Sequence, residues 1–452
     1  MFRIIKYHLY LLQLENYNLG RYWRVAPKKI FLRDKMRQKI VWTPKLSGVF
    51  TLAIILQIAV AYFAVRPLAN DEVYLGFFPA TFMFLFLFLS FFHFVFLTLA
   101  VLAVWPFDYM VKSYLVNKAR TKMKQLTHDR GLVVIGITGS YGKTTMKEAL
   151  AAILSIKFKI VKTPESVNTP VGISRLILSQ LTVETEIFIV EMGAYQRGDI
   201  RALCEIAKPD IAVLTGINEA HLERFRSIEN TIKGKFEIVE NARVGGLVVL
   251  NGDDARVKEN YQKFTDQRRV ELYNAASSKY QDLTVPLLGD YIWGIINACG
   301  IIASELRLSE EEIRRGIINL KPIPHRLQLI ENRSAGITVI DDSYNGNPDG
   351  AREAIKALAK FEGRRKIYIT PGLVEMGERS REVHKEIGRE LAGVADIVIL
   401  IRNSVTPLIA VELDPHKVIY FDSATLAHNS LQNILKHGDV VMFQNDWPDN
   451  YL

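Results

Sequence analysis

Two long apolar runs near the start of the chain restrict what this region can become. Residues 46–65 carry no charge, and residues 73–105 hold only His93 as an ionisable side chain. Each run is long enough to cross a hydrocarbon core of roughly 30 Å, so we predict two transmembrane helices within residues 46–106. Pro79 is expected to interrupt the second run. A cleaved signal peptide is disfavoured, because 45 residues precede the first run and no small-residue cleavage site follows it.

The positive charge of the chain is concentrated beside these runs. Residues 1–48 hold 11 Lys and Arg against 2 acids, and residues 107–130 hold 6 against 2, whereas residues 131–452 hold 39 against 42. The mild acidity of the largest part disfavours nucleic-acid binding. The positive-inside rule places both ends of the chain in the cytoplasm.

The two basic segments, residues 1–45 and 107–130, have aromatic and aliphatic residues interleaved with Lys and Arg. We predict an interfacial N-terminal segment and a basic juxtamembrane helix, either of which could instead contact a partner.

His93 is expected to be a neutral imidazole bonded to a neighbouring helix rather than a functional group. Cys204 and Cys299 are far apart and outside any CxxC, so they predict neither a disulfide framework nor a zinc site, in keeping with a reducing compartment.

From residue 131 onward, short apolar runs alternate with helical stretches. This alternation predicts an α/β fold with a mostly parallel sheet covered on both faces. The segment KPIPHR, residues 321–326, breaks the pattern and is typical of a linker. We therefore predict a central domain over 131–321 and a smaller α/β domain over 322–452.

The stretch GITGSYGKTT, residues 136–145, follows a buried-type strand and precedes a helix. Backbone N–H groups and a helix N-terminus can then surround a phosphate. Lys143 would reach the β- and γ-phosphates, and the Thr144 hydroxyl would bind Mg²⁺. The usual spacing GxxxxGK[ST] is not met in full, since its first glycine falls on Ile137, and a chance GKT in a glycine turn is the alternative.

Two further side chains follow predicted strands. Glu191 ends the apolar strand EIFIVE, where an acid beside a phosphate loop suits a hard cation; a solvated strand end is the alternative. His221 follows the strand IAVLTGI in the same position relative to the sheet. Alone, it would more often be a bonded structural histidine.

Several short motifs occur in one order along the chain. They are TGSYGKTT at 138–145, NTPVGI at 168–173, EMGA at 191–194, EAHLERF at 219–225, HRLQ at 325–328 and DDSYNGNP at 341–348. This ordered set resembles the Mur ligase family, ATP-dependent amide-forming enzymes of cell-wall precursor synthesis. The branch most similar to it adds D-alanyl-D-alanine to a UDP-N-acetylmuramoyl tripeptide. The resemblance covers residues 131–445 and implies a phosphate-loop central domain and a Rossmann-like C-terminal domain, here preceded by two transmembrane helices instead of a UDP-binding domain.

The resemblance also implies a site that binds ATP and Mg²⁺. The residues expected to bind the nucleotide phosphates form the loop itself: Gly139, Ser140, Tyr141, Gly142, Lys143, Thr144 and Thr145. It assigns Mg²⁺ to Glu191 and His221, and a second Mg²⁺ to a carbamylated Lys235, with Lys233 as a neighbour that could be confused with it.

Four more residues match family positions. Asn168 resembles a catalytic-site asparagine and Asn297 the residue that reads adenine, while Arg326 and Asp342 resemble the phosphate-binding arginine and the ribose-contacting aspartate. Because Arg326 and Asp342 belong to the second domain, nucleotide would bind in a cleft that domain closure completes. The chain departs from the family at Tyr291, where a His-Asn pair is usual, and in its PGLVEMG and FQNDWPDNY segments.

The reaction implied is activation of a carboxylate to an acyl phosphate, followed by attack of an amine. The expected partners are a UDP-linked or lipid-linked precursor peptide, an amino acid or dipeptide amine, the membrane, and a possible subunit that recognises the substrate. The alternatives are a non-catalytic nucleotide-binding scaffold, another amide ligase of the superfamily and a transport ATPase.

Overall fold

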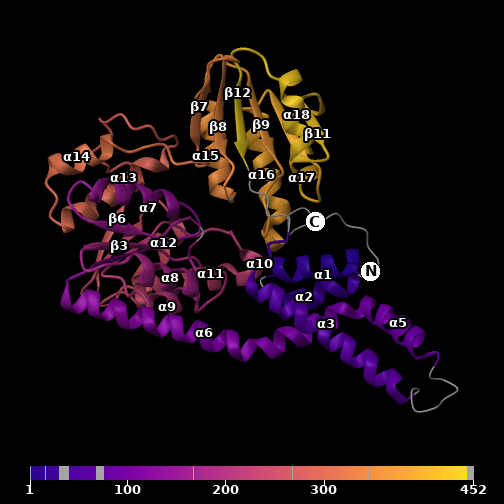
Figure 1. Cartoon of the computed structure of the whole chain (residues 1–452). Coiled ribbons are helices and arrows are strands. Elements are labelled where there is room, and N and C mark those ends of the chain that lie inside the picture. The colour runs from indigo at the N-terminus through magenta and orange to yellow at the C-terminus, as the bar shows by residue number, and fades with distance from the viewer. Residues whose placement is uncertain are drawn as a thin grey trace. The chain divides into compact units, whose positions relative to one another are not determined.

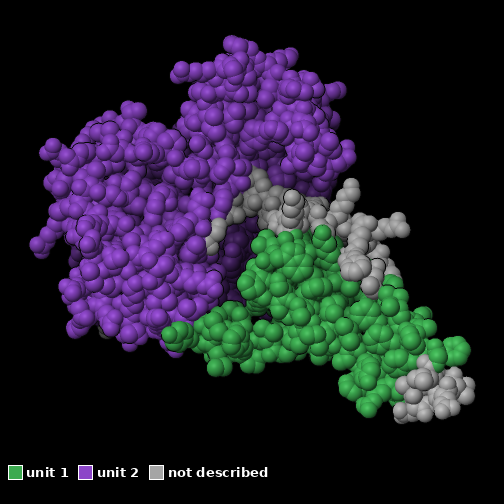
Figure 2. Space-filling model, viewed as in Figure 1, with its two compact units in different colours: residues 1–114, 449–451 green, residues 115–448, 452 purple. Residues whose placement is uncertain are grey.

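The computed structural model describes residues 2–15, 17–29, 40–67, 76–165, 167–266, 268–344 and 346–444. The chain forms two compact units, residues 1–114 and residues 115–448 (Figure 2). Most of the FQNDWPDNY ending lies outside the described residues, apart from Phe443 and Gln444.

The described part of the first unit is helical (Figure 1). Its elements are α1 Phe2–Leu14, α2 Leu19–Val25, η1 Ala26–Lys29, α3 Pro44–Val65, α5 Phe78–Leu89, η3 Ser90–Phe92 and the first part of α6 His93–Asp129. Thr43 caps α3, because its hydroxyl accepts a hydrogen bond from the Leu46 N–H at 3.1 Å. The core of this unit gathers apolar residues from α1, α2, α3 and α6, among them Leu12 and Leu97, which are fully buried.

Two described helical segments, Pro44–Val65 and Phe78–Asp129, are long and apolar enough to cross a membrane, judged by length and composition. Pro79 lies in the first turn of α5, so it begins a helix rather than interrupting one. His93 Nδ1 lies 3.0 Å from Gln57 Oε1 on α3, which agrees with the expected bond to a neighbouring helix.

The second unit contains a parallel six-stranded sheet in the order β2-β3-β1-β4-β5-β6. The strands are β1 Val133–Thr138, β2 Ile160–Lys162, β3 Ile187–Glu191, β4 Ile211–Leu214, β5 Leu247–Asn251 and β6 Arg269–Tyr273. Alternate residues of each strand face opposite layers, so Val134 and Ile135 of β1 belong to different core clusters. We call this sheet and its helices the central domain.

Helices cover both faces of the central sheet. They are α7 Lys143–Leu154, α8 Pro170–Gln180, α9 Asp199–Cys204, α10 Leu222–Phe225, α11 Ile228–Glu240, α12 Ala255–Asn260, η4 Tyr261–Lys263, α13 Tyr291–Glu305 and α14 Glu310–Ile318. One face packs against α8, α9 and α11, and the other against α7, α13 and α14.

The end of α6 also belongs to this unit. Ala119, Met123 and Leu126 are buried in the core beneath α8 and α9. Lys122 Nζ donates to the Leu178 carbonyl at 3.1 Å, and Arg120 forms an ion pair with Glu205. The segment that the sequence predicts as a juxtamembrane helix is therefore, over its last turns, part of the core of the second unit.

A second six-stranded sheet forms the C-terminal domain, in the order β11-β10-β9-β12-β8-β7 with only β7 antiparallel. Its elements are β7 Gln328–Asn332, β8 Ile337–Asp342, α15 Pro348–Ala359, β9 Lys366–Thr370, η5 Gly377–Arg379, α16 Ser380–Ala392, β10 Ile397–Ile401, α17 Thr406–Ala410, η6 Pro415–Lys417, β11 Val418–Phe421, α18 Ala424–Ile434 and β12 Val440–Gln444. The predicted α/β architecture with two sheets is confirmed.

Candidate active site

The loop Gly139–Thr145 connects the end of β1 to the N-terminus of α7, as predicted. Gly139 has φ +152°, and a Cβ there would lie 2.0 Å from Thr215 Oγ1. Ser140 N–H donates to the Gly216 carbonyl at 2.8 Å, and the Tyr141 hydroxyl donates to Asp254 at 2.8 Å. The loop is therefore held tightly at the carboxyl edge of the sheet, directly before the N-terminus of α7.

Lys143 is the first residue of α7 and folds back over the loop. Its Nζ donates to the Gly139 carbonyl at 2.7 Å. Burial lowers the pKa of Lys143; the charge of Glu191 opposes this shift and that of Arg326 adds to it. The structure thus brings a lysine of the loop, an acid of β3 and an arginine of the C-terminal domain into one electrostatic environment.

Glu191 ends β3 beside the loop and is 8% exposed. Thr144 Oγ1 donates to Glu191 Oε2 at 3.2 Å. Lys147, one turn after Lys143 on α7 and fully buried, places its Nζ 3.0 Å from the same carboxylate oxygen. Glu191 therefore already has a counterion, which the sequence reasoning did not single out.

His221 precedes α10 and adopts a left-handed conformation with φ +60°. Its Nδ1 is hydrogen-bonded to Glu375 of the C-terminal domain, and Arg224 Nε donates to the same carboxylate at 2.7 Å. Burial lowers the pKa of His221, while its hydrogen bond and charge interaction with Glu375 act in the opposite direction. The Tyr195 ring lies 4.8 Å from the imidazole, centroid to centroid.

Lys235 lies on α11 and is buried, whereas Lys233 is exposed. Burial and the nearby charge of Lys143 hold the pKa of Lys235 well below its usual value. Its Nζ lies 5.6 Å from the centre of the Phe225 ring, and no carboxylate among the described residues forms an ion pair with it. Burial thus distinguishes Lys235 from Lys233, the two lysines that the sequence alone could confuse.

Arg326 and Asp342 lie where the C-terminal domain begins. Arg326 Nη1 donates to the Tyr344 carbonyl at 2.8 Å, and Asp342 Oδ1 accepts from the Leu327 N–H at 3.2 Å. Burial raises the pKa of Asp342 to about 7, against the effect of Arg326. Tyr291 packs against the cores of both domains, and burial together with the charge of Asp342 raises its pKa to about 12.

The two predicted asparagines have different surroundings. Asn168 lies beside Gly193, just after Glu191, since a Cβ on that glycine would be 2.6 Å from Asn168 Nδ2. Asn297 lies on α13, which borders the phosphate loop, but its side-chain amide donates to the Asn274 carbonyl at 2.9 Å. Asn168 is thus next to the candidate cation ligand, and Asn297 is held by a neighbouring loop.

Comparison with known families agrees with this arrangement. Residues 137–291 match the Mur ligase middle domain, and residues 325–444 match the Mur ligase glutamate ligase domain. The chain therefore belongs to the Mur ligase family.

Several relatives of this Mur ligase chain carry the same name. It is 29% identical over 299 residues to the UDP-N-acetylmuramoyl-tripeptide--D-alanyl-D-alanine ligase of Bacillus subtilis, covering 61% of this chain and 64% of that protein. The Escherichia coli protein of the same name is 30% identical over 291 residues, covering 58% and 63%. The chain thus spans less than two thirds of the length of these curated relatives. It also resembles the crystal structure of MurF ligase from Thermotoga maritima in complex with ADP, at 28% identity and a TM-score of 0.64, covering 74% and 79%.

The two Mur ligase domains contact each other beside the phosphate loop. Asn218, four residues beyond β4, donates to Asn347 Oδ1 at 2.9 Å and to Asp349 Oδ2 at 2.7 Å, both in the C-terminal domain. The Glu375 contacts with His221 and Arg224 join the same domains. These bonds connect the segment after β4 to both DDSYNGNP and PGLVEMG.

Two features of the loop bear on whether it can bind a nucleotide. Its closed backbone leaves no room for a Cβ at Gly139, and two cations, Lys143 and Arg326, act on one another there. Among the described residues, no three His, Cys, Asp or Glu side chains are grouped as a ready metal site. A cation beside Thr144 and Glu191 would therefore need further ligands, such as oxygens of the nucleotide.

Sequence reasoning missed the residues that support these side chains. Lys147 could have been noticed as a lysine one turn beyond Lys143 on the same helix. Glu375 lies in PGLVEMG, which the sequence marked only as a departure from the family. Asp254 and Tyr195 gave no local signal, because their contacts depend on how distant loops meet.

Proposed function

We propose that this chain is an ATP- and Mg²⁺-dependent ligase of peptidoglycan-precursor synthesis. It would join a carboxylate of a muramoyl-linked peptide to the amine of D-alanyl-D-alanine. The observation that carries this proposal is a phosphate loop whose Thr144 lies 3.2 Å from Glu191 and whose flanking segment bonds to the second Mur ligase domain through Asn218. The names of the relatives supply the substrate class.

In this proposal, the residues of the chain bind and orient the nucleotide. Backbone N–H groups of the loop and Lys143 hold its phosphates, while Thr144 and Glu191 hold the cation. Arg326 and Asp342 contact it from the C-terminal domain. When bound, ATP supplies the phosphoryl group that activates the substrate carboxylate, and the fixed positive charges offset charge that accumulates during transfer.

Two further assignments depend on the surroundings of their residues. His221 would hold Mg²⁺ through the ring nitrogen that does not contact Glu375, and Asn168 would orient the reacting groups beside Glu191. Lys235 would be carbamylated, because burial lowers its pKa and so raises the share of the neutral amine, the form that adds CO₂. The resulting carboxylate would supply the anionic ligand for a second Mg²⁺.

We also propose that the enzyme is attached to the membrane by α3 and by α5 with α6. Large apolar side chains on these segments face outward, including Ile55, Phe63, Phe84 and Phe88. So many exposed large apolar side chains on neighbouring helices are unusual for a soluble monomer. The precursor would then be presented at the bilayer as a lipid-linked molecule, or a partner subunit would bind its nucleotide part.

The ligase proposal is tested with the full chain in mild detergent, given MgATP, UDP-N-acetylmuramoyl tripeptide and D-alanyl-D-alanine. Mass spectrometry should show the ligated product, and phosphate release should require both substrates. Lys143→Ala should lower the rate by about 100-fold or more, the effect of losing one charge-stabilising donor. Lys233→Ala, at an exposed lysine, should leave the rate unchanged.

Phosphate release without either substrate, equal in wild type and Lys143→Ala, would refute the ligase. Nucleotide binding with no turnover on any precursor would support a scaffold instead. If a lipid-linked tripeptide is ligated no faster than the soluble one, the idea of a lipid-presented precursor fails. The ligase proposal itself is not affected by that result.

A further inference from the structure

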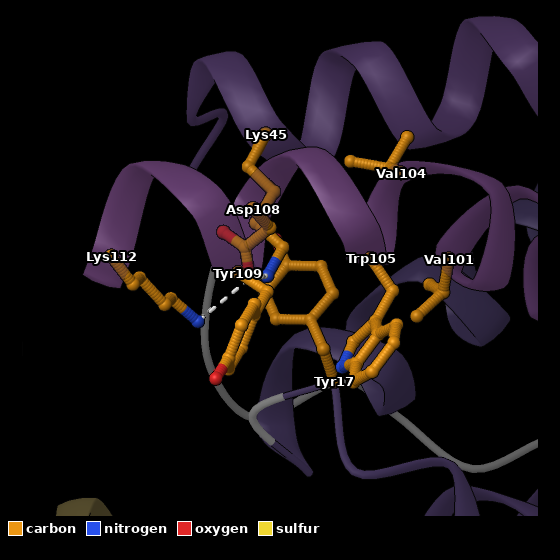
Figure 3. A pocket seen from close by; sticks show the side chains of 8 residues that line it. All are labelled: Tyr17, Lys45, Val101, Val104, Trp105, Asp108, Tyr109 and Lys112. Carbon is orange, nitrogen blue, oxygen red and sulfur yellow. Dashed lines mark hydrogen bonds and ion pairs between the residues drawn. The ribbon is translucent and has the colours of Figure 1, made fainter. Parts of the chain in front are cut away.

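A cavity of about 230 Å³ lies in the first unit, where α3 begins and α6 changes from an apolar to a basic sequence (Figure 3). It is lined by Tyr17, Lys45, Val101, Val104, Trp105, Asp108, Tyr109 and Lys112. We call it the interfacial cavity. None of its lining residues belongs to the candidate active site.

The charged side of the cavity carries excess positive charge. Asp108 Oδ2 accepts from Lys45 Nζ at 2.9 Å and from Lys112 Nζ at 2.7 Å, so two ammonium groups share one carboxylate oxygen. Each ammonium has three N–H donors, so both can bind a further anion.

The other side of the cavity is apolar and aromatic. Val101 and Val104 line it, and the Trp105 ring stacks on Tyr109 with centroids 5.8 Å apart. Trp105 is 60% exposed, and Leu102, one turn earlier, is 53% exposed. An apolar surface therefore continues from the cavity along α6 in the direction of the proposed membrane segment.

This combination fits an amphipathic anion rather than a free one. Lysines and aromatic rings at the border of an apolar helix are the usual anchors at the headgroup level of a bilayer. The volume accommodates a phosphate headgroup but not a hydrocarbon chain, which would lie outside the cavity along Leu102 and Trp105. A purely polar ligand would leave the apolar wall in contact with water.

We propose that the interfacial cavity is a binding site for the phosphate headgroup of an anionic lipid, held by Lys45 and Lys112. The site rests on the proposed membrane attachment but is independent of the ligase reaction. It gives the first unit a selective lipid contact in addition to insertion of apolar helices.

The test is native mass spectrometry of the full chain in neutral detergent, titrated with dioleoyl phosphatidylglycerol or dioleoyl phosphatidylcholine. Phosphatidylglycerol should bind more tightly than phosphatidylcholine. Lys112→Gln should weaken its binding about tenfold, the effect of one charge-assisted hydrogen bond, and Lys45→Gln should do the same. Lys124→Gln, an exposed lysine further along α6, should change it less than about twofold.

Asp108→Asn is the decisive variant, because it releases both ammonium groups while keeping the side-chain shape. The proposal requires it to bind phosphatidylglycerol more tightly, by at least about threefold. If Asp108 serves only to join α3 to α6, the variant should bind no more tightly than wild type, and the proposal fails. Thermal unfolding of each variant is measured in parallel. If Asp108→Asn unfolds at a lower temperature than wild type, the binding results for Lys45→Gln and Lys112→Gln test the proposal instead.

Other outcomes also overturn the proposal. Equal weakening by Lys112→Gln and Lys124→Gln would show general electrostatic attraction. Equal binding of both lipids would leave membrane attachment intact but remove the selective site. Displacement of phosphatidylglycerol by an equimolar amount of inorganic phosphate would identify a free phosphate ligand instead of a lipid.

Discussion

The buried pair between Lys147 and Glu191 makes a quantitative prediction. Lys147 is fully buried, its Nζ is 3.0 Å from Glu191 Oε2, and Glu148 offers a second carboxylate only at 4.0 Å. Lys147→Met keeps the length and packing of the side chain but leaves the Glu191 charge uncompensated. Breaking a buried ion pair in this way costs about 3–5 kcal/mol.

The lower end of that range applies here, because the Thr144 hydroxyl and the charge of Lys143 still stabilise Glu191. A loss of about 3 kcal/mol should lower the unfolding temperature of the ligand-free second unit, residues 115–448, by roughly 4 °C. Glu191→Gln should cost a similar amount, since it leaves the buried Lys147 ammonium with only the Glu148 carboxylate at 4.0 Å. The double variant should recover most of the loss, because neutral replacement of a buried pair is often nearly neutral.

The assay is thermal unfolding of the full chain in detergent, followed by intrinsic fluorescence, for wild type, both single variants and the double variant. Lys233→Met, at an exposed lysine on α11, is the control and should melt with wild type. Additive losses in the double variant would refute the reasoning, because two independent effects would mean that Lys147 and Glu191 do not compensate each other.

Three other outcomes are expected. Gly139→Ala should abolish binding of MgADP, measured by calorimetry, because its Cβ would lie 2.0 Å from Thr215 Oγ1; Gly245→Ala, also at positive φ but with open space around it, should bind normally. Burial raises the pKa of the Cys204 thiol to about 12, and Cys299 is also buried. Both cysteines should therefore resist iodoacetamide at pH 9 and react only after unfolding, and rapid labelling of the native protein would contradict their burial. A carbamate signal from ¹³C-bicarbonate should appear by NMR in wild type and in Lys233→Ala but be absent in Lys235→Ala; its persistence there would assign it to another amine.

The sequence predicts those parts of the site that are local. The strand, loop and helix around Lys143 follow from one short segment, and Glu191 follows from the end of an apolar run. The buried state of Lys235 does not follow, because it depends on how α11 lies against the sheet. Glu375 could not be predicted as a partner of His221, since the two are 154 residues apart and meet only through contact between domains.

The membrane-proximal region shows the same limit. Composition alone identifies both apolar runs, and helices of suitable length form there. Hydropathy and charge do not show that α6 passes through Pro106 without ending, or that its last turns bury Met123 in the second unit. Those features depend on tertiary packing, which a pattern of single residues does not record.

The claim that a nucleotide binds between the two Mur ligase domains is tested most directly by calorimetry with MgADP. Lys143→Ala in the central domain and Arg326→Ala in the C-terminal domain should each weaken binding about tenfold or more, since each removes a charge-assisted contact. Arg333→Ala, at an exposed arginine of the same C-terminal domain, should bind as wild type does. Wild-type affinity in Arg326→Ala would show that the C-terminal domain does not hold the nucleotide, and would contradict the account.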